Sequence, residues 1–366
     1  MDSSVAALLL KEQGYELTGC FMRSFDTEAS LRECEMAEAI AGRLGIGFMV
    51  EDRRADFLKE IIDNFILEYA HGRTPNPCCI CNPRIKWPSM LSAMEKAGAS
   101  FVATGHYAGI GFDEHIGAGG RYYIKRADDI KKDQSYVLYG LTQEELSHTL
   151  LPLSGYSKEE IRELAKEAGL ETAEKPDSQE ICFIPGDDRV GFIRNYAERL
   201  LRELPKEEAD GLRSAIYEGG AFTDIHGEVI GHHDGLVNFT IGQRKGLGTA
   251  FGQRMFVKEL IPSENRVVLT DNAGLFSDRA YVGDMSFQAL DMESLLRLSP
   301  EAEFSAFVKI RYADKGQMGR VSIKDGLCSI AFETPVRAVT PGQAAVLYDD
   351  EGRILAGGRI LRDNNT

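Results

Sequence analysis

Short apolar runs alternate with amphipathic helical patterns along the first hundred residues, and this alternation constrains the fold most strongly. Residues 15–22, 46–50 and 100–104 have the composition of short strands. Between them, residues 28–44 and 57–69 carry apolar side chains at spacings of three and four, as amphipathic helices do. Such alternation predicts a parallel sheet covered by helices on both faces. Ligands of these sheets bind at the carboxyl ends of the strands.

The pattern changes twice further along the chain. Residues 189–203 predict one more helix, followed by a glycine-rich region with short strands. Beyond that region helical patterns nearly vanish, apart from residues 292–296, and short strands split by turn residues predict a small antiparallel β-barrel. We place the first two strands of this barrel at residues 255–260 and 266–270. The predicted domains are residues 1–186, 187–253 and 254–366.

A proline-rich stretch at residues 74–87, Thr-Pro-Asn-Pro-Cys-Cys-Ile-Cys-Asn-Pro-Arg-Ile-Lys-Trp, holds three of the seven cysteines. Proline removes a backbone donor and fixes φ, so the stretch predicts a stiff loop that presents thiols and excludes a helix interior. The following Arg84 and Lys86 would favour thiolate over thiol if they lie near the sulfur atoms. A structural metal site and a reactive thiol fit this stretch equally well.

Another cysteine lies in a second proline-flanked segment, Lys-Pro-Asp-Ser-Gln-Glu-Ile-Cys-Phe-Ile at residues 175–184. Its Cys182 follows Cys81 by 101 residues. Two separated cysteines in an intracellular chain suit a thiol relay, in which one carries a sulfur atom and the other displaces it and leaves a disulfide.

Bulk properties narrow the setting. The chain has 366 residues, and its hydrophobic content of 43% is that of a globular protein. A formal charge of −15 is unusual for a nucleic-acid-binding protein, yet a local basic face can still bind phosphate. Seven cysteines, an odd number at low density, indicate a reducing cytosol. The apolar run at residues 5–10 is too short for a signal or a membrane span, so we expect a cytoplasmic protein without membrane contact.

Several motifs together resemble one family. Thr-Pro-Asn-Pro-x-x-x-Cys-Asn, followed by Asp-Ser-x-x-Ile-Cys-Phe-Ile, is similar to the tRNA-specific 2-thiouridylases (MnmA/TrmU family). Further blocks of that family occur in the same order, and the match runs from residue 2 to the C-terminus. These blocks are Ala-Thr-Gly-His-Tyr at 103–107, Lys-Asp-Gln-Ser-Tyr at 132–136, Thr-Ile-Gly-Gln-Arg-Lys-Gly-Leu-Gly at 240–248 and Thr-Pro-Gly-Gln at 340–343.

The resemblance implies a fold and an activity. The fold is a Rossmann-like PP-loop domain of the adenine nucleotide hydrolase type, then a small tRNA-binding adaptor domain and a C-terminal β-barrel. The activity is adenylation of the wobble uridine of tRNA at C2 and replacement of O2 by sulfur, with ATP and Mg²⁺ as cofactors and AMP and pyrophosphate released. The implied partners are the tRNAs for Lys, Glu and Gln and a persulfide donor, either a cysteine desulfurase or a sulfur-relay protein.

The ATP site implied by the resemblance consists of Asp2, Ser3, Met22 and Gly105. In the family, the helix that begins here follows a strand and a Ser-Gly-Gly-x-Asp-Ser loop that cradles pyrophosphate. Neither precedes Asp2 here, so we expect a start codon assigned at an internal methionine. We also expect weak ATP binding by the chain as given, and a sheet with exposed strand edges or core.

Residues that contact tRNA follow from the same resemblance. Asn76, Pro77 and Cys78 would contact the target base. From the residues alone, the segment at 132–134 is an ordinary solvated turn, and Arg311-Tyr312 fits a salt-bridged strand end as well as an RNA contact. The residues assigned to tRNA by the resemblance are His106, Lys132, Asp133, Gln134, Arg311, Tyr312 and Gln343.

The catalytic roles implied are a persulfide on Cys182 and a nucleophile at Cys81, which then form a transient disulfide. Many family members carry Asp where this chain has Cys78, so the acid or base role of that position is open. With Cys78, the set Cys78, Cys81 and Cys182 could instead ligate a 4Fe–4S cluster that holds an extra sulfide. Otherwise the protein has no metal site by this reading.

Two alternatives lie outside this mechanism. Without the phosphate loop, the chain could be an inactive tRNA-binding relative. It could also be another ATP pyrophosphatase that makes amide or amidine bonds, although those chemistries need no paired thiols.

Overall fold

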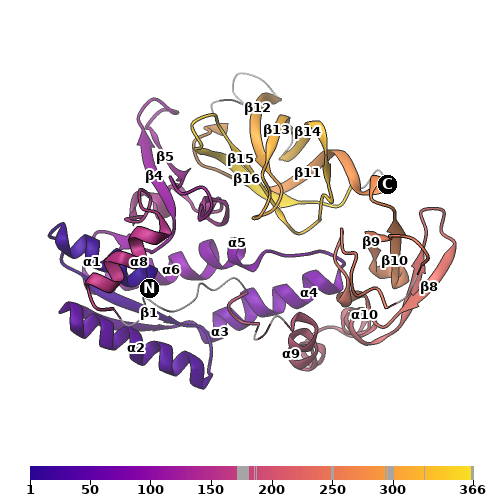
Figure 1. Cartoon of the computed structure of the whole chain (residues 1–366), viewed down its shortest axis with the longest axis horizontal. Helices are drawn as coiled ribbons and strands as arrows, with labels where there is room; N and C mark the ends of the chain where they lie inside the picture. Colours follow the sequence, from indigo (N-terminus) through magenta and orange to yellow (C-terminus); the bar gives the residue numbers. More distant parts are fainter. Residues whose placement is uncertain are drawn as a thin grey trace.

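The computed structural model describes residues 1–170, 181–184, 186, 188–248, 251–292, 295, 301–324 and 326–363. Figure 1 shows an N-terminal α/β domain on the left, a β-barrel above it and a smaller sheet with two helices on the right. The predicted combination of a parallel sheet, a small central domain and a C-terminal antiparallel barrel is thus confirmed. Within these described residues, no helix is both long and apolar enough to cross a membrane.

The N-terminal domain contains two parallel strand pairs covered by helices. In the first pair, β1 and β2 align from Thr18 opposite Gly47 to Arg23 opposite Asp52. In the second, the two-residue strands β3 and β6 align Val102 with Thr149. The elements are α1 (Asp2–Glu12), β1 (Thr18–Arg23), α2 (Glu28–Leu44), β2 (Gly47–Asp52), β3 (Val102–Ala103), β6 (Thr149–Leu150) and α8 (Lys158–Glu167).

The ends of these helices follow their sequence signals. Thr27 caps α2, because its side chain accepts a hydrogen bond from the Ser30 N–H. Gly45 ends the same helix with a left-handed φ of 61°. At α8, Ser157 and Glu160 form the capping box that their spacing in the sequence predicts. Local capping therefore fixes where the helices begin and end.

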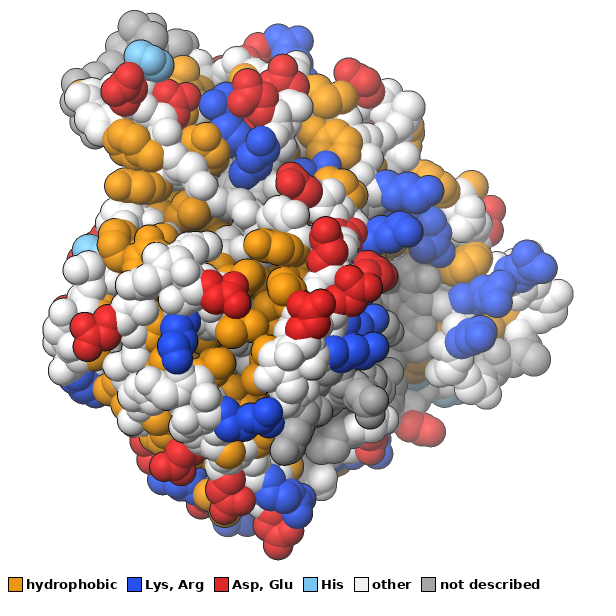
Figure 2. Space-filling model, turned by 60° about the vertical axis from the view of Figure 1, so that its left-hand side comes forward, with side chains coloured by type: hydrophobic (Ala, Val, Ile, Leu, Met, Phe, Trp, Pro, Cys, Tyr) orange, Lys and Arg blue, Asp and Glu red, His pale blue; other side chains and the backbone are white. Residues whose placement is uncertain are grey.

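A cavity of about 450 Å³ separates the two strand pairs. Phe21 of β1 and Val102 of β3 line it from opposite sides, and Ile40 of α2 and Met94 of α6 contribute apolar side chains. β1 pairs only with β2, and β3 only with β6, so the strand edges that face the cavity lack partners among the described strands. This agrees with the expected exposure of strand edges. Hydrophobic side chains are visible across the lower half of the face in Figure 2.

The cysteine stretch is helical, so the prediction of a stiff non-helical loop is wrong. Pro77 occupies the first helical position, where no backbone donor is needed, and the Asn76 side chain accepts the Cys78 N–H at 3.1 Å. A π-helical turn follows and accommodates Pro83, because its wider path does not require an i→i−4 hydrogen bond there. The three consecutive segments are α5 (Pro77–Cys81), the π-turn η2 (Asn82–Lys86) and α6 (Trp87–Ala97).

Another long helix packs beside the cysteine helix. The helix predicted at residues 57–69 runs from Arg54 to Ala70 and also contains a π-helical turn. Its segments are α3 (Arg54–Phe57), η1 (Leu58–Asp63) and α4 (Asn64–Ala70). Between α6 and α8, the structure adds elements that the sequence pattern did not predict. These are β4 (Ala108–Asp113), β5 (Arg121–Arg126), the 3₁₀ turn η3 (Ser135–Leu138) and α7 (Gln143–Ser147).

The central sheet has the order β8-β7-β10-β9. The prediction that residues 255–260 and 266–270 are part of the barrel is wrong, because β10 pairs in parallel with β7, Val267 opposite Phe222. The glycine-rich residues 240–248 form turns rather than a hairpin. The elements are α9 (Arg189–Glu203), α10 (Lys206–Tyr217), β7 (Gly220–Thr223), β8 (Val229–His233), β9 (Phe256–Ile261) and β10 (Arg266–Thr270).

The C-terminal strands close into a barrel in the order β11-β14-β13-β12-β15-β16. Along β12, Ala306 and Val308 are buried inside, as the period of two predicts. The helix predicted at residues 292–296 lies largely outside the described residues. The strands are β11 (Phe276–Phe287), β12 (Ala302–Lys309), β13 (Gln317–Lys324), β14 (Leu327–Arg337), β15 (Ala344–Tyr348) and β16 (Ile354–Ile360).

A buried amide is one of the contacts that dock the barrel on the N-terminal domain. Gln288 is fully buried, and its Nε2 donates to the carbonyl oxygens of Leu138 at 2.9 Å and Tyr139 at 3.1 Å. Its Oε1 accepts the Ile124 N–H at 2.9 Å. Because all three partners are backbone groups, this side chain fixes the position of the barrel relative to the segment that covers the cysteine helix.

We predict that Gln288→Leu lowers the free energy of unfolding by about 2–4 kcal/mol, since it leaves buried backbone groups unpaired. The measurement is urea unfolding followed by the fluorescence of Trp87, the single tryptophan, which lies in the core shared with the barrel. The control is Gln317→Leu, which removes an exposed amide and is expected to cost less than about 0.5 kcal/mol. Equal effects of the two substitutions would contradict the docking role.

Candidate active site

An aromatic cluster brings the two cysteine segments together. Phe183, directly after Cys182, lies 5.3 Å from Phe65 and 5.8 Å from Phe57 between ring centroids, in edge-to-face geometry. Cys81 packs against the same hydrophobic cluster from the end of α5. Cys81 and the residues on either side of Cys182, 101 residues further along, therefore pack on one hydrophobic cluster.

The thiols of Cys81 and Cys182 are free and interact electrostatically. Burial raises the pKa of Cys81 to about 12, and the neighbouring Cys182 and Cys78 contribute to that increase. Burial likewise raises the pKa of Cys182 to about 11, with Cys78 and Glu33 contributing. Each sulfur is close enough for its charge to affect the others, and both are protonated at neutral pH.

The expected thiolate is therefore absent from the free protein. Lys86 does lower the pKa of Cys81, but burial outweighs it. Arg84, the other expected cation, is paired with Glu60 at 3.0 Å. Lys86 thus acts in the expected direction, but desolvation opposes ionisation of this buried thiol more strongly.

The neighbouring cysteines differ in accessibility. Cys78 is exposed, and its backbone N–H is held by Asn76. Cys79 is only 7% exposed and packs into a second hydrophobic cluster beneath the barrel. Pro77 is buried, whereas Asn76 is partly exposed with its side-chain oxygen occupied by the cap. Of the three residues predicted to contact the target base, Cys78 is thus the most accessible.

Three cysteines near one another do not make a formed metal site here. Among the described residues, no group of three or more His, Cys, Asp or Glu side chains is arranged to hold a metal ion. The ligand set of the cluster alternative, Cys78, Cys81 and Cys182, is therefore not preassembled. The adjoining Asp177 and Ser178 of the second cysteine segment lie outside the described residues.

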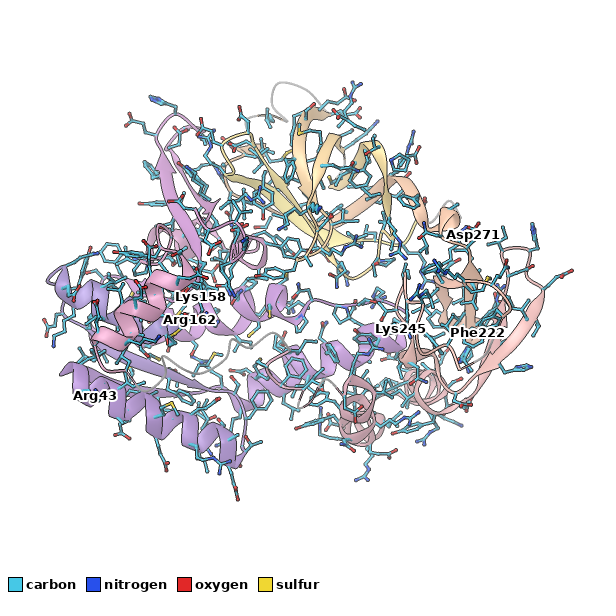
Figure 3. The ribbon with its side chains drawn as sticks, in the orientation of Figure 1. Arg43, Lys158, Arg162, Phe222, Lys245 and Asp271 are labelled. Carbon is cyan, nitrogen blue, oxygen red and sulfur yellow. The ribbon has the colours of Figure 1, made fainter. Side chains whose placement is uncertain are left out.

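The residues predicted for ATP gather at the carboxyl ends of strands. A Cβ atom on Gly105 would lie 2.6 Å from the Asp2 carbonyl carbon and the Ser3 nitrogen, so only glycine allows α1 to begin against the end of β3. Asp2 accepts hydrogen bonds from the Tyr107 hydroxyl at 3.1 Å and from Lys158 Nζ at 2.8 Å. Figure 3 labels Lys158 on α8, beside the start of α1.

Met22 lies near the carboxyl end of β1, where it is partly buried against the aromatic cluster. Gly105 likewise follows the carboxyl end of its strand, β3. The arrangement agrees with the rule that ligands of parallel sheets bind at the carboxyl ends.

His106 follows directly and is held as a neutral imidazole. Burial, and next the charge of Lys86, lower its pKa well below the usual value. Its Nδ1 lies 2.8 Å from the Thr104 hydroxyl, and its ring is 5.7 Å from that of Trp87. A neutral His106 can accept or donate a hydrogen bond near the cysteines without adding charge.

Two residues predicted to contact tRNA face inward. Asp133 is 4% exposed and accepts hydrogen bonds from the backbone N–H groups of Ala127 and Ser135. The Gln134 side chain accepts the Tyr107 N–H at 3.0 Å. Both therefore shape the backbone beside His106, whereas Lys132 is partly exposed.

The barrel residues predicted for tRNA behave differently from one another. Tyr312 is 43% exposed. Burial, and next the charges of Asp133 and Cys78, raise the pKa of its hydroxyl. Its ring therefore lies on the side of the barrel that faces the cysteines. Arg311 donates to the Arg337 carbonyl oxygen at 3.2 Å. Gln343 donates to the Thr74 carbonyl oxygen at 2.8 Å and so ties the barrel to the start of the cysteine stretch.

Sequence reasoning missed Lys309 as a site residue. It is 6% exposed, and its Nζ lies 5.8 Å from the Tyr136 ring and 6.0 Å from the Tyr312 ring. Burial lowers its pKa. By the period of two, Lys309 and Arg311 lie on the same side of the predicted strand, and this was the available signal. The sequence does not reveal which end of the barrel faces the cysteines.

Comparison with known proteins decides the family. The tRNA methyl transferase HUP domain model matches residues 1–186, the tRNA methyl transferase PRC-barrel domain model residues 213–271 and the aminomethyltransferase beta-barrel domain model residues 285–360. The tRNA-specific 2-thiouridylase MnmA of Clostridioides difficile (strain 630) is 40% identical over 371 residues, covering 99% of this chain and 95% of the relative. The chain belongs to the tRNA-specific 2-thiouridylase family.

Other members of this family match equally well. The tRNA-specific 2-thiouridylase MnmA of Clostridium acetobutylicum is 41% identical over 373 residues, covering 99% of this chain and 97% of the relative. Among solved structures, the U34-tRNA thiolase NcsA from Methanococcus maripaludis with its 4Fe-4S cluster aligns at a TM-score of 0.33 and 16% identity, over 59% of this chain and 68% of that one. A likeness at this level supports no argument about chemistry.

We predict that iodoacetamide alkylates Cys81 of the free protein slowly at neutral pH. The rate should rise about tenfold per pH unit up to about pH 10 without a plateau, because the thiol ionises only at high pH. Mass spectrometry of the Cys81 peptide measures this rate, with glutathione as the reference thiol. A plateau near neutral pH would instead reveal a resident thiolate and contradict the site described here.

Proposed function

We propose that the protein is a tRNA 2-thiouridylase that uses ATP to replace O2 of the wobble uridine by sulfur. One observation supports this most strongly. The thiols of Cys81 and Cys182 interact, and Cys81 and the neighbours of Cys182 pack on one hydrophobic cluster, although 101 residues separate the two cysteines in the sequence. Sulfur relay needs such a pair, since one thiol must carry the sulfur and another must displace it.

ATP enters as the substrate that activates the uracil oxygen. Ser3 at the start of α1, Gly105 and Met22 would hold the nucleotide, with Mg²⁺ on its phosphates. The close approach of Gly105 to Asp2 and Ser3 supports this assignment, because it leaves the N-terminus of α1 uncovered by a side chain on the β3 side. Adenylation of O2 releases pyrophosphate and turns a poor leaving group into AMP.

Sulfur transfer then involves the two cysteines. Cys182 carries a persulfide, and Cys81 loses its proton to solvent and attacks the Cys182 Sγ. The bond between that Sγ and the outer sulfur breaks, and the sulfide attacks C2, loses its proton and displaces AMP. Both cysteines end oxidised as a disulfide, which an external thiol reduces. The donor of the persulfide is a cysteine desulfurase or a sulfur-relay protein.

Binding of tRNA draws on all three domains: residues 1–186, a central domain that starts at residue 187 and extends through β10, and the barrel that begins with β11. The wobble base leaves its stack and enters beside Asn76, Pro77 and Cys78, with the exposed Tyr312 ring on the barrel side. His106 and Lys132, together with the backbone held by Asp133 and Gln134, would contact the RNA, as would Arg311 and Gln343. Figure 2 shows Lys and Arg side chains along one side of the molecule, which supports local phosphate binding despite the net negative charge.

The substrates proposed are the tRNAs for Lys, Glu and Gln, and the location proposed is the cytoplasm. The location is supported by seven free cysteines, which suit a reducing compartment.

A mercury-gel assay of tRNA thiolation tests the proposal. We predict that the protein retards tRNA with a wobble uridine, and that Cys81→Ser and Cys182→Ser each abolish the retardation because each removes one sulfur of the relay. Cys34→Ser, on α2, is the matched control and should keep the activity. We also predict that an added N-terminal strand and Ser-Gly-Gly loop increases the rate through better ATP binding. Thiolation by Cys81→Ser at the wild-type rate would disprove the relay.

The same samples separate the alternatives. A colourless protein with a trappable persulfide on Cys182 supports the relay. Brown protein whose iron disappears in Cys78→Ser but not in Cys79→Ser would replace the relay by a 4Fe–4S mechanism. Binding of tRNA with no thiolation, even with the added loop, would make the protein a binding relative.

A further inference from the structure

Lys86 differs from the other cations of the cysteine helix because it has no anionic partner. Arg84, two residues earlier, pairs with Glu60 at 3.0 Å. Within the described part of the chain, by contrast, no carboxylate forms an ion pair with Lys86, and no hydrogen bond holds it. The side chain is only partly exposed, so solvent does not fully surround the ammonium group. An unpaired, half-covered ammonium group favours an anion beside it.

The turn that carries Lys86 is anchored on both sides. It is the last residue of η2, whose wider turn is closed by the Trp87 N–H donating to the Asn82 carbonyl oxygen. Asn82 is buried and donates to the Val137 carbonyl oxygen at 2.8 Å, and Ile85 and Trp87 are buried on either side of Lys86. These anchors fix the backbone of the turn that carries Lys86, directly after the helix that ends in Cys81.

The neighbours of Lys86 show what lies on that face. Its charge lowers the pKa of the thiols of Cys78, Cys81 and Cys182, and it also acts on His106. Among the described residues, Glu33 is the carboxylate that acts on this group, and it affects Cys182. Because the thiols are protonated and His106 is neutral in the free protein, no described anion is paired with Lys86 until sulfur ionises.

We propose that Lys86 is the counter-ion of the sulfur anion that forms between Cys81 and Cys182 during transfer. This inference deepens the proposed function, on which it rests. When Cys81 gives its proton to solvent and attacks the Cys182 Sγ, negative charge passes from the Cys81 sulfur to the departing sulfide. A single ammonium group beside both sulfur atoms stabilises the charge at the start and at the end of this step.

The test compares Lys86→Met with Lys86→Arg, and with Arg84→Met as the matched control on the same turn. The first readout is the rate of alkylation of Cys81 by iodoacetamide as a function of pH in the free protein. We expect Lys86→Met to lower this rate about tenfold at a given pH, which corresponds to one pKa unit. Lys86→Arg and Arg84→Met should stay within about twofold of the wild type. Thermal unfolding checks that each variant is folded, and Lys86→Gln replaces Lys86→Met if that variant is not.

The second readout separates this inference from the proposed function. In single-turnover thiolation by persulfide-loaded protein, we expect Lys86→Met to slow the transfer step without changing the concentration of ATP or tRNA at half-saturation. An unchanged alkylation rate together with weaker ATP or tRNA binding would overturn the inference, because Lys86 would then bind a phosphate. The proposed function fails on a different result, namely thiolation of tRNA by Cys81→Ser at the wild-type rate. That result would not change the effect of Lys86→Met on the alkylation of Cys81.

Discussion

The packing of Phe183 against Phe57 and Phe65 is the contact on which the site depends. Full burial of one phenylalanine side chain stabilises a protein by about 1.5–3 kcal/mol, and each favourable aromatic pair adds about 0.5–1.5 kcal/mol. Ile181 and Ile184 pack against the same hydrophobic cluster, so this ring and these two side chains anchor the segment around Cys182. Without the anchor, Cys182 would belong to a loop, and its meeting with Cys81 would carry the full entropy of loop closure.

The same burial that brings the sulfur atoms together also keeps them unreactive. Burial raises the pKa of both thiols, which lowers the fraction of thiolate at neutral pH. A relay protein benefits from this, because a resident thiolate would react with oxidants or form the disulfide before sulfur arrives. Reactivity then has to come with the substrates, through the persulfide, the activated base and the cation at Lys86. In the free protein, the two sulfur atoms are thus already close together, but neither thiol is ionised.

Local signals in the sequence were enough for much of the secondary structure. The helix at Glu28–Leu44 and the helix at Arg189–Glu203 lie where the periodicity predicted them, and Ser157 caps the helix that it was predicted to cap. The cysteine stretch was mispredicted because proline counts against a helix interior in general, whereas a first helical position and a π-turn both tolerate it. Strands β9 and β10 were assigned to the wrong domain because a strand pattern does not show which partner it pairs with.

The candidate site was predictable in part and for a different reason. The order of the motifs identified the cysteines, but residue types alone did not reveal which side chains face the interior of the protein. Asp133 and Gln134 have the composition of a solvated turn, yet they bind backbone groups of the fold. Lys86 and Arg84 look equivalent in the sequence, and only the pairing of Arg84 with Glu60, across 24 residues, distinguishes them. Such assignments depend on contacts between distant segments, which no local pattern encodes.

The central claim is that the sulfur atoms of Cys81 and Cys182 meet, and disulfide mapping after brief diamide oxidation tests it most directly. The account predicts that a peptide pair joining Cys81 to Cys182 forms first and in highest yield, and that Phe183→Ala slows its formation while the protein remains folded. If Cys182 instead pairs with other cysteines, or stays free while Cys81 does as well, the two thiols do not share a site and the account is wrong.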